Sequence, residues 1–337
     1  MPSNDLRPRP LVISPLNSRQ TDLTMNAMTT RHNEAHIDAW REKGFVLIPD
    51  FFTADEIAPV CADYEALYGG FRPEHGEAID VKKEGMIGAT HRKQFLHTEI
   101  LPYQGGIDMN LLSLHPAVIR LARDLLGVPA VHLYQSHTWA KFTGEADYDQ
   151  HHHCDFGNHT LTVPSENAAL RSVDFIIYLT DVTDDLGALH YVEKADSARI
   201  LGQGEIMAQP EHQQALKACE KSAAAPAGAL LAHSIDTFHR GTNLTRKGGH
   251  RYTMTAGYKA AGNDLVSFHV WQQAMNRPWD KVINHASPEQ LACLGIPEPG
   301  DPYWSPRTLK LTQDRWPDWD MTPYFASTLG NADASTA

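Results

Sequence analysis

The sequence lacks an excess of positive charge and any long apolar run. Its 337 residues contain 29 Lys and Arg against 41 Asp and Glu, which gives a formal net charge of −12. An acidic balance disfavours nucleic acid and anionic membranes as partners, because both are bound through basic surfaces. No segment approaches the roughly 18 apolar residues that a membrane helix needs. We therefore expect no nucleic-acid or membrane partner, and the sequence does not indicate an oligomeric state.

Cysteine is also scarce, with four residues and no C-x-x-C pair: Cys61, Cys154, Cys219 and Cys293. Scattered cysteines in a chain of this length favour reduced thiols over a disulfide framework. The first thirty residues lack the apolar core of a secretion signal. These two features predict a cytoplasmic protein. Histidine, in contrast, is abundant at 19 residues, which raises the prior for a metal site.

The chain divides into two polar ends and one long central part. Residues 1–31 and 327–337 are polar, without sustained periodicity, and we expect disordered tails there. Residues 32–326 are expected to form a single domain. Capping residues, Pro and Gly predict helices at about 33–42, after Thr53 and from Pro116, with a buried strand at 45–48. Near the C-terminus, Ser287 and Gln290 have the spacing of a capping box, which predicts a short helix there. Residues 69–112 are Gly-rich and irregular, and we expect loops there.

Short strand-like segments dominate from Ala130 onwards. They are 131–142, 148–155, 172–180, 188–192, 228–233 and 251–259. This density predicts a mainly β fold, a two-sheet antiparallel barrel or jelly roll at about 130–260 with helices packed outside. Residues 198–225 are polar and rich in Ala and Gln, and are expected to be an insertion between core strands.

The segment Q-H-H-H-C-D-F at 150–156 carries the most specific chemistry. His153 and Asp155 have the i, i+2 spacing that places two side chains on one face of an extended strand, with Cys154 pointing away. His239, in H-R-G-T-N, can complete a set of two imidazoles and one carboxylate. That set is the facial triad of non-haem iron(II) oxygenases, which leaves coordination positions open. His233 is a rival to His239, and His151 shares the face of His153.

Arg251 follows His239 after a polar turn. A strand, turn and return strand would bring Arg251 back beside His239. Its guanidinium can hold a carboxylate through two parallel hydrogen bonds. The distal carboxylate of 2-oxoglutarate fits this role.

Further residues adjoin this predicted site. We expect Lys141 to assist in binding 2-oxoglutarate, and four residues to line a substrate pocket: Gln135, Trp139, Tyr148 and His159. For each of these, packing or surface exposure is an equally good interpretation. His152 is expected to point outward or to be structural, and His97, His132 and His137 are expected to be structural residues of the barrel.

Four segments together resemble the phytanoyl-CoA dioxygenase family over most of residues 36–260. W-R-E-K-G-F-V-L-I-P-D-F-F-T-A-D-E-I is similar to the family's N-terminal helix, strand and helix. H-H-C-D-F carries the H-x-D, followed by Y-L-T-D-V-T-D-D-L-G-A-L-H-Y-V. H-R-G-T-N-L-T-R-K-G-G-H-R-Y resembles the distal histidine, turn and arginine. The resemblance implies a double-stranded β-helix (jelly-roll, cupin-like) core with flanking helices.

The resemblance also implies cofactors and a reaction. Iron(II) would bind His153, Asp155 and His239, with 2-oxoglutarate on Arg251 and O2 as the oxidant. The spacing from His239 is longer than is common in the family, so Arg246 is an alternative anchor. Halogenating relatives lack the carboxylate, so Asp155 favours hydroxylation or a related oxidation of a C–H bond in a small-molecule metabolite, with release of succinate and CO2.

Two other functions are compatible with the sequence. One is a cupin-type metalloenzyme that uses His151, His153 and His239 without 2-oxoglutarate. The other is a jelly-roll binding module without catalysis. The V-E-K-A-D-S stretch stands where the family usually has a Pro-Gly-Ser-His-like segment, and residues beyond about 265 match no motif. The substrate and the position of oxidation are not indicated.

Overall fold

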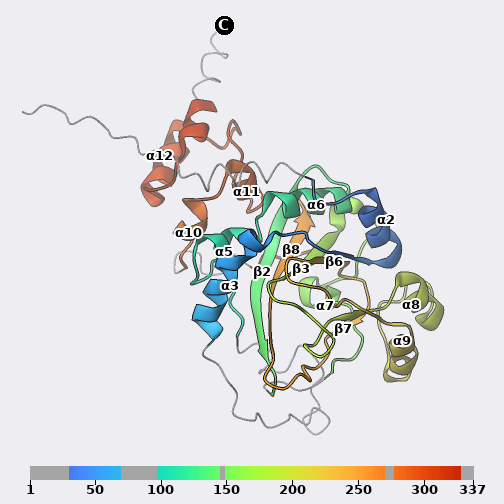
Figure 1. The fold of residues 1–337 in the computed structure, drawn as a ribbon. Helices are drawn as coiled ribbons and strands as arrows, with labels where there is room; N and C mark the ends of the chain where they lie inside the picture. Colours follow the sequence, from blue (N-terminus) through green and yellow to red (C-terminus); the bar gives the residue numbers. More distant parts are fainter. Residues whose placement is uncertain (1–29, 70–96, 145–148, 270–276, 328–337) are drawn as a thin grey trace, which may run out of the picture.

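A computed structural model describes residues 30–69, 97–144, 149–269 and 277–327. Nearly all of the two predicted tails, and Tyr148, lie outside the described residues. The described part is a mixed structure of helices around two antiparallel sheets (Figure 1). Within it, no helix combines the length and the apolar character needed to cross a membrane.

The larger sheet has five strands in the order β1-β6-β3-β8-β2. Its strands are β1 (Phe45–Ile48), β6 (Leu230–Ser234), β3 (Ser172–Tyr178), β8 (His250–Ala260) and β2 (Val131–Phe142). The long strands β2 and β8 pair along their whole length, with a register shift between Leu133 and Gln135, and form the centre of the molecule (Figure 1). The predicted strands at 45–48, 131–142, 172–180, 228–233 and 251–259 are therefore confirmed.

The smaller sheet has three short strands in the order β5-β4-β7. They are β5 (Lys221–Ser222), β4 (His190–Tyr191) and β7 (His239–Arg240). The predicted strand at 188–192 corresponds to β4. The predicted insertion at 198–225 includes the end of α8 (Lys194–Leu201), η4 (Pro210–His212), α9 (Gln213–Cys219) and strand β5. In Figure 1, α8 and α9 lie together on the side opposite the C-terminal helices.

The N-terminal elements follow their capping residues. The helix α2 (Glu34–Lys43) begins after the Asn33 cap and ends at Gly44, whose φ of 88° lies in the left-handed region. The helix α3 (Ala54–Tyr68) begins at Thr53, whose capping box with Glu56 is formed. The helix α6 (Pro116–Leu126) has Pro at its first position and Gly127 after its end. All three predicted helices are confirmed, because their signals are local in sequence.

Glu56 ties this N-terminal part together. Its carboxylate accepts hydrogen bonds from Arg31 at 2.8 and 2.7 Å and lies 3.2 Å from the His115 ring. Burial opposes ionisation of Glu56, but the hydrogen bonds from His115 and Arg31 hold its pKa well below the usual range. Glu56 therefore favours the folded state as an anion.

Two predictions of local structure were wrong. Residues 107–112, expected as loop, form α5 (Ile107–Leu112), which packs against α3 and buries Met109 and Leu112. Residues 148–155, expected as strand, make one isolated bridge between His153 and His239 in their described part. Asp155 is helical (φ −79°, ψ −10°) and precedes the short helix α7 (Phe156–His159). Strand alternation is thus not the reason that His153 and Asp155 converge.

The C-terminal part adds further helices, among them α10 (Asp280–Ile283), α11 (Pro288–Ala292) and α12 (Pro306–Arg315) (Figure 1). The helix α10 packs against α5. Earlier in the chain, η3 (Ala168–Leu170) precedes β3. The predicted capping box at Ser287 is present at the start of α11. Trp304, Trp319 and Tyr324 pack edge to face and are buried in the main hydrophobic core.

Candidate metal centre and its cavity

His153, Asp155 and His239 converge in the described structure. One possible ligand atom from each lies within 4.8 Å of the others. The bridge between His153 and His239 is made by two backbone hydrogen bonds, of 2.9 and 3.0 Å. Asp155 then turns back toward both rings because the chain bends into α7. The predicted trio is therefore brought together by one bridge and one turn.

Both imidazoles are oriented through their second nitrogen. The Nδ1 atom of His153 lies 2.8 Å from the carbonyl of His151, and that of His239 lies 3.1 Å from the carbonyl of Thr237. A carbonyl accepts a hydrogen bond, so each Nδ1 carries the proton and each Nε2 keeps its lone pair. The two Nε2 atoms lie 3.6 and 3.3 Å from the Asp155 carboxylate. Such backbone support is typical of histidine metal ligands.

The electrostatics favour an anion at Asp155. Burial disfavours the ionised carboxyl, but a positive charge on His239 and the close imidazoles of His153 and His233 hold the pKa of Asp155 well below its usual range. Burial likewise opposes a charged His239, yet Asp155 raises the pKa of His239 above its usual value. A carboxylate enclosed by imidazoles is the donor set that a divalent metal would bind.

The rival histidines differ in position. His151 is exposed and does not line the cavity that holds the trio. His233 is buried, with its Nε2 3.4 Å from Asp155 and its Nδ1 2.8 Å from the Tyr191 hydroxyl. It belongs to a second group of possible ligands, with Asp155 and Asp174. His233 is thus a neighbour of the centre, and His151 is not.

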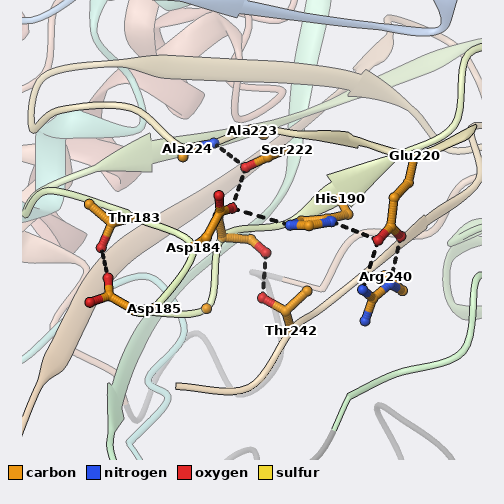
Figure 2. Close-up of polar contacts among 12 residues, drawn as sticks. Thr183, Asp184, Asp185, His190, Glu220, Ser222, Ala223, Ala224, Arg240 and Thr242 are labelled. Carbon is orange, nitrogen blue, oxygen red and sulfur yellow. Dashed lines mark hydrogen bonds and ion pairs between the residues drawn. The ribbon is translucent and has the colours of Figure 1, made fainter. Parts of the chain in front are cut away.

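Glu220, just before β5, holds the segments on both sides of the trio. Its carboxylate accepts two hydrogen bonds from Arg240, at 2.7 and 2.9 Å, and lies 3.0 Å from the ring of His152. Arg240 follows His239 and His152 precedes His153, so a single carboxylate contacts a neighbour of each candidate histidine ligand. Figure 2 shows Glu220 between Arg240 and His190, with Asp184 on the far side of His190.

Hydrogen bonds keep Glu220 ionised in this network. Burial opposes ionisation of Glu220, but hydrogen bonds from Arg240 and His190 lower its pKa to about 2. Burial lowers the pKa of His152 to about 4. Gln213 adds a second support, since its side chain hydrogen-bonds the backbone N–H and carbonyl of His152 at 2.7 and 3.2 Å. The segment predicted as an insertion therefore supplies two residues that hold the candidate ligands in place.

The trio opens into a cavity of about 330 Å³ that Arg251 also lines. Arg251 lies on β8 and is 6% exposed. One terminal nitrogen donates to the carbonyl of Gly187, while its Nε atom has no hydrogen-bond partner among the described residues. Burial lowers the pKa of Arg251 to about 10, which still leaves a cation. A buried, partly unpaired guanidinium in a cavity fits an anionic guest.

The predicted route of Arg251 to the site was wrong. β7, which carries His239, pairs with β4 in the smaller sheet, while β8 pairs with β2 and β3 in the larger one. The two residues therefore face one cavity from different sheets. Arg246, the alternative anchor, is half-exposed and pairs with Asp185 at 2.8 Å, and it does not line the cavity.

Most of the other predicted pocket residues line the same cavity. Lys141 is paired with Arg251 across β2 and β8, and Trp139 lies two residues earlier on β2. Gln135 and His159 line the cavity as well. His137 was expected to be structural but also lines it, and burial lowers its pKa to about 4. His97 and His132 do not line it and instead pack against aromatic rings.

Several cavity residues were not predicted, above all Asp174. Asp174, on β3, is 2% exposed and lines the cavity. The polar residue in the otherwise apolar strand S-V-D-F-I-I-Y was the available signal, because a buried carboxylate is rare without a partner. Cys154 packs beside Val192 and Phe238 and does not line the cavity, as predicted.

The comparison with sequence families decides the classification. The sequence model of the family "Phytanoyl-CoA dioxygenase (PhyH)" matches residues 40–250, more than half of the chain. This chain belongs to the phytanoyl-CoA dioxygenase family. It uses the family's cofactors, iron(II), 2-oxoglutarate and dioxygen. No curated protein sequence matches it.

Solved structures with a similar fold include three oxygenase-type enzymes. The carbocyclase SnoK of nogalamycin biosynthesis has a TM-score of 0.54 at 20% identity, over 74% of this chain and 93% of that one. EctD from S. alaskensis, solved with 2-oxoglutarate and 5-hydroxyectoine, has a TM-score of 0.51 at 17% identity, over 75% and 84%. The epimerase SnoN, in complex with Fe3+, alpha ketoglutarate and nogalamycin RO, has a TM-score of 0.50 at 20% identity, over 68% and 83%. At these identities the likeness shows the fold alone.

Proposed function

We propose that this protein is an iron(II)- and 2-oxoglutarate-dependent dioxygenase that hydroxylates a C–H bond of a small-molecule metabolite. We also propose that residues 32–326 form one domain, and that its two antiparallel sheets form a double-stranded β-helix (jelly-roll) core. The TM-scores of 0.54 and 0.51 with SnoK and EctD support such a core.

One observation carries the proposal. Two imidazoles and a carboxylate converge at a cavity, and a buried arginine with an unpaired Nε lines the same cavity. The trio supplies three protein ligands and leaves the other positions of an octahedral ion open. The arginine, with Lys141 opposite on the neighbouring strand, supplies two cations for one end of a dicarboxylate.

The chain's own groups have distinct roles in this proposal. His153, Asp155 and His239 hold the metal, which supplies the activation of dioxygen when bound. Arg251 orients the distal carboxylate of 2-oxoglutarate through charge-assisted hydrogen bonds, with Lys141 beside it. The backbone carbonyls of His151 and Thr237 keep both imidazoles in the tautomer with a free Nε2. The largely buried walls exclude water from the reacting groups.

Hydroxylation is the reaction that the residues favour. Asp155 occupies the position that a halide would need on the metal, so halogenation is disfavoured. A cupin-type enzyme that uses His151 is also disfavoured, because His151 is exposed and lies outside the cavity.

Succinate release tests the proposal. The protein is loaded with iron(II) and 2-oxoglutarate without oxygen, oxygen is then admitted, and succinate is measured. We expect succinate that depends on both additions, at a rate strongly reduced in Asp155→Ala and unchanged in Asp318→Asn, an exposed control. Turnover without 2-oxoglutarate would instead indicate a cupin-type enzyme. No succinate with intact protein would indicate a binding module.

A further inference from the structure

Asp174 is a buried carboxylate that the metal centre and the 2-oxoglutarate site do not use. It is 2% exposed and lines the cavity. Its Oδ1 accepts hydrogen bonds from the Tyr134 hydroxyl at 2.6 Å and from Gln135 Nε2 at 3.0 Å. Its Oδ2 lies 3.6 Å from His159 Nδ1, beyond hydrogen-bond distance. One carboxylate oxygen is thus saturated by neutral donors and the other is not.

Asp174 lacks a permanently charged partner. Among the described residues, no Lys or Arg nitrogen lies within 4.0 Å of its carboxylate, and its basic neighbours are the imidazoles of His159 and His233. Arg251 and Lys141 are paired farther along β8 and β2, and the register position of Asp174 on β8 is Gly257. Roughly 20 Å of extended strand separates Gly257 from Arg251. A buried carboxylate without a cation is costly, so a cation that enters the cavity here would be bound.

The fold makes room for this carboxylate. A Cβ atom at Gly257 would lie 2.4 Å from Asp174 Oδ1 and 2.5 Å from Gln135 Cγ. Both are closer than real Cβ contacts, so no residue other than glycine fits without displacing these side chains. The arrangement of Asp174, Gln135 and Tyr134 therefore depends on the absence of a side chain at Gly257 on β8.

The carboxylate of Asp174 is next to the metal centre. One of its oxygens, one of Asp155 and one nitrogen of His233 lie within 4.8 Å of one another. His233 Nε2 is buried and has no hydrogen-bond partner among the described residues. A group bound at Asp174 would thus lie beside the trio, at the end of the cavity away from Arg251. That is where a substrate has to be held for oxidation.

We propose that Asp174 is a specificity-determining residue that binds a protonated amine of the substrate. The substrate class is then small amine-bearing molecules, and carboxylic acids are disfavoured because their negative charge would approach Asp174. The ammonium donates to the Oδ2 side of Asp174, while Tyr134 and Gln135 hold Oδ1 in place. This assignment rests on the proposed function.

Matched probes test the charge directly. Equilibrium dialysis is run without oxygen on the protein loaded with iron(II) and 2-oxoglutarate. The probes are cyclohexylamine, cyclohexanol and cyclohexanecarboxylate, together with the corresponding 2-phenylethyl and hexyl series. We expect each amine to be retained at least about 10-fold more than its alcohol and acid, as for a hydrogen bond to a charged group. Equal retention within each series, or no retention of any amine, would overturn the proposal.

Variants test whether Asp174 causes the preference for amines. Asp174→Asn should abolish the amine preference, while Asp318→Asn, the same change on the surface, should keep it. Gly257→Ala displaces the carboxylate without changing the charge and should weaken the preference too. A preference that persists in Asp174→Asn, or a second metal ion bound per chain through Asp174, would contradict the assignment.

Failure of this proposal can be distinguished from failure of the proposed function. Succinate release by the wild type without any probe measures the oxygenase chemistry alone. Succinate with no amine preference would reject the role of Asp174 and retain the enzyme class. Absence of succinate would reject the enzyme class itself, whatever the probes do.

Discussion

Substitution of Glu220 by Gln removes one charge from the network that holds both candidate histidine ligands. Glu220 and Arg240 have side chains only 10% and 7% exposed, and two hydrogen bonds join them. Breaking such a buried pair on one side typically costs roughly 3–5 kcal/mol, because a charge is left unpaired. Gln keeps one acceptor and Arg240 also lies 3.1 Å from Asp149, so we expect a loss of stability of about 3 kcal/mol.

The same substitution should weaken metal binding. Glu220 contacts the residues adjacent to His153 and His239, and outer partners of metal ligands commonly change affinity by about 10- to 100-fold. We therefore expect the iron(II) Kd of Glu220→Gln to rise about 10-fold, the lower end of that range, because the contact is one residue removed.

The assay separates positioning from folding. Unfolding by urea gives the stability, and anaerobic iron(II) titration far below the Tm gives the affinity. Glu166→Gln is the matched control, because Glu166 pairs with Arg171 but its side chain is 98% exposed. A variant that loses stability with an unchanged iron(II) Kd would refute the positioning role. A variant unchanged in both would show that the network does not hold the site.

Three further predictions concern other parts of the molecule. Arg251→Ala should raise the KM for 2-oxoglutarate by about 100-fold, because two charged hydrogen bonds are lost. Arg246→Ala should change this KM little. Equal effects of the two variants would reject Arg251 as the residue that binds 2-oxoglutarate. Gly187→Ala should lower the free energy of unfolding, measured in urea, by about 1–3 kcal/mol, because the φ of Gly187 is 77° and the added Cβ would lie 2.8 Å from a carbonyl oxygen. An unchanged midpoint of urea unfolding would contradict this geometry. Glu56→Gln should be less stable than the wild type at neutral pH. Because folding lowers the pKa of Glu56, this difference in the free energy of unfolding should shrink as the pH falls below about 4.5. A difference independent of pH would contradict the ionised network.

The sequence predicted what depends on local signals. The caps at Asn33, Thr53 and Ser287 and the proline at the start of α6 mark helices through contacts within three residues, and all four are present. The strand-like composition of 131–142 and 251–259 predicted β2 and β8. The helix α5 was not predicted, because no side chain caps its first turn and its formation depends on packing against α3.

The candidate site was predicted in its composition more than in its geometry. The convergence of His153 and Asp155 was correct, but it results from a bridge and a turn, which strand alternation does not describe. The roles of Glu220 and Asp174 could not be predicted, because each depends on partners far away in sequence. A lone carboxylate in an apolar strand was the one visible sign of Asp174.

Anomalous diffraction at the iron edge is the most direct test of the central claim. Crystals grown without oxygen in iron(II) and 2-oxoglutarate should show one peak about 2.1 Å from the Nε2 atoms of His153 and His239 and from an Asp155 oxygen. The same map should show a carboxylate of 2-oxoglutarate on Arg251. A peak held by Asp174 and His233 instead, or no peak in a saturated crystal, would contradict the account.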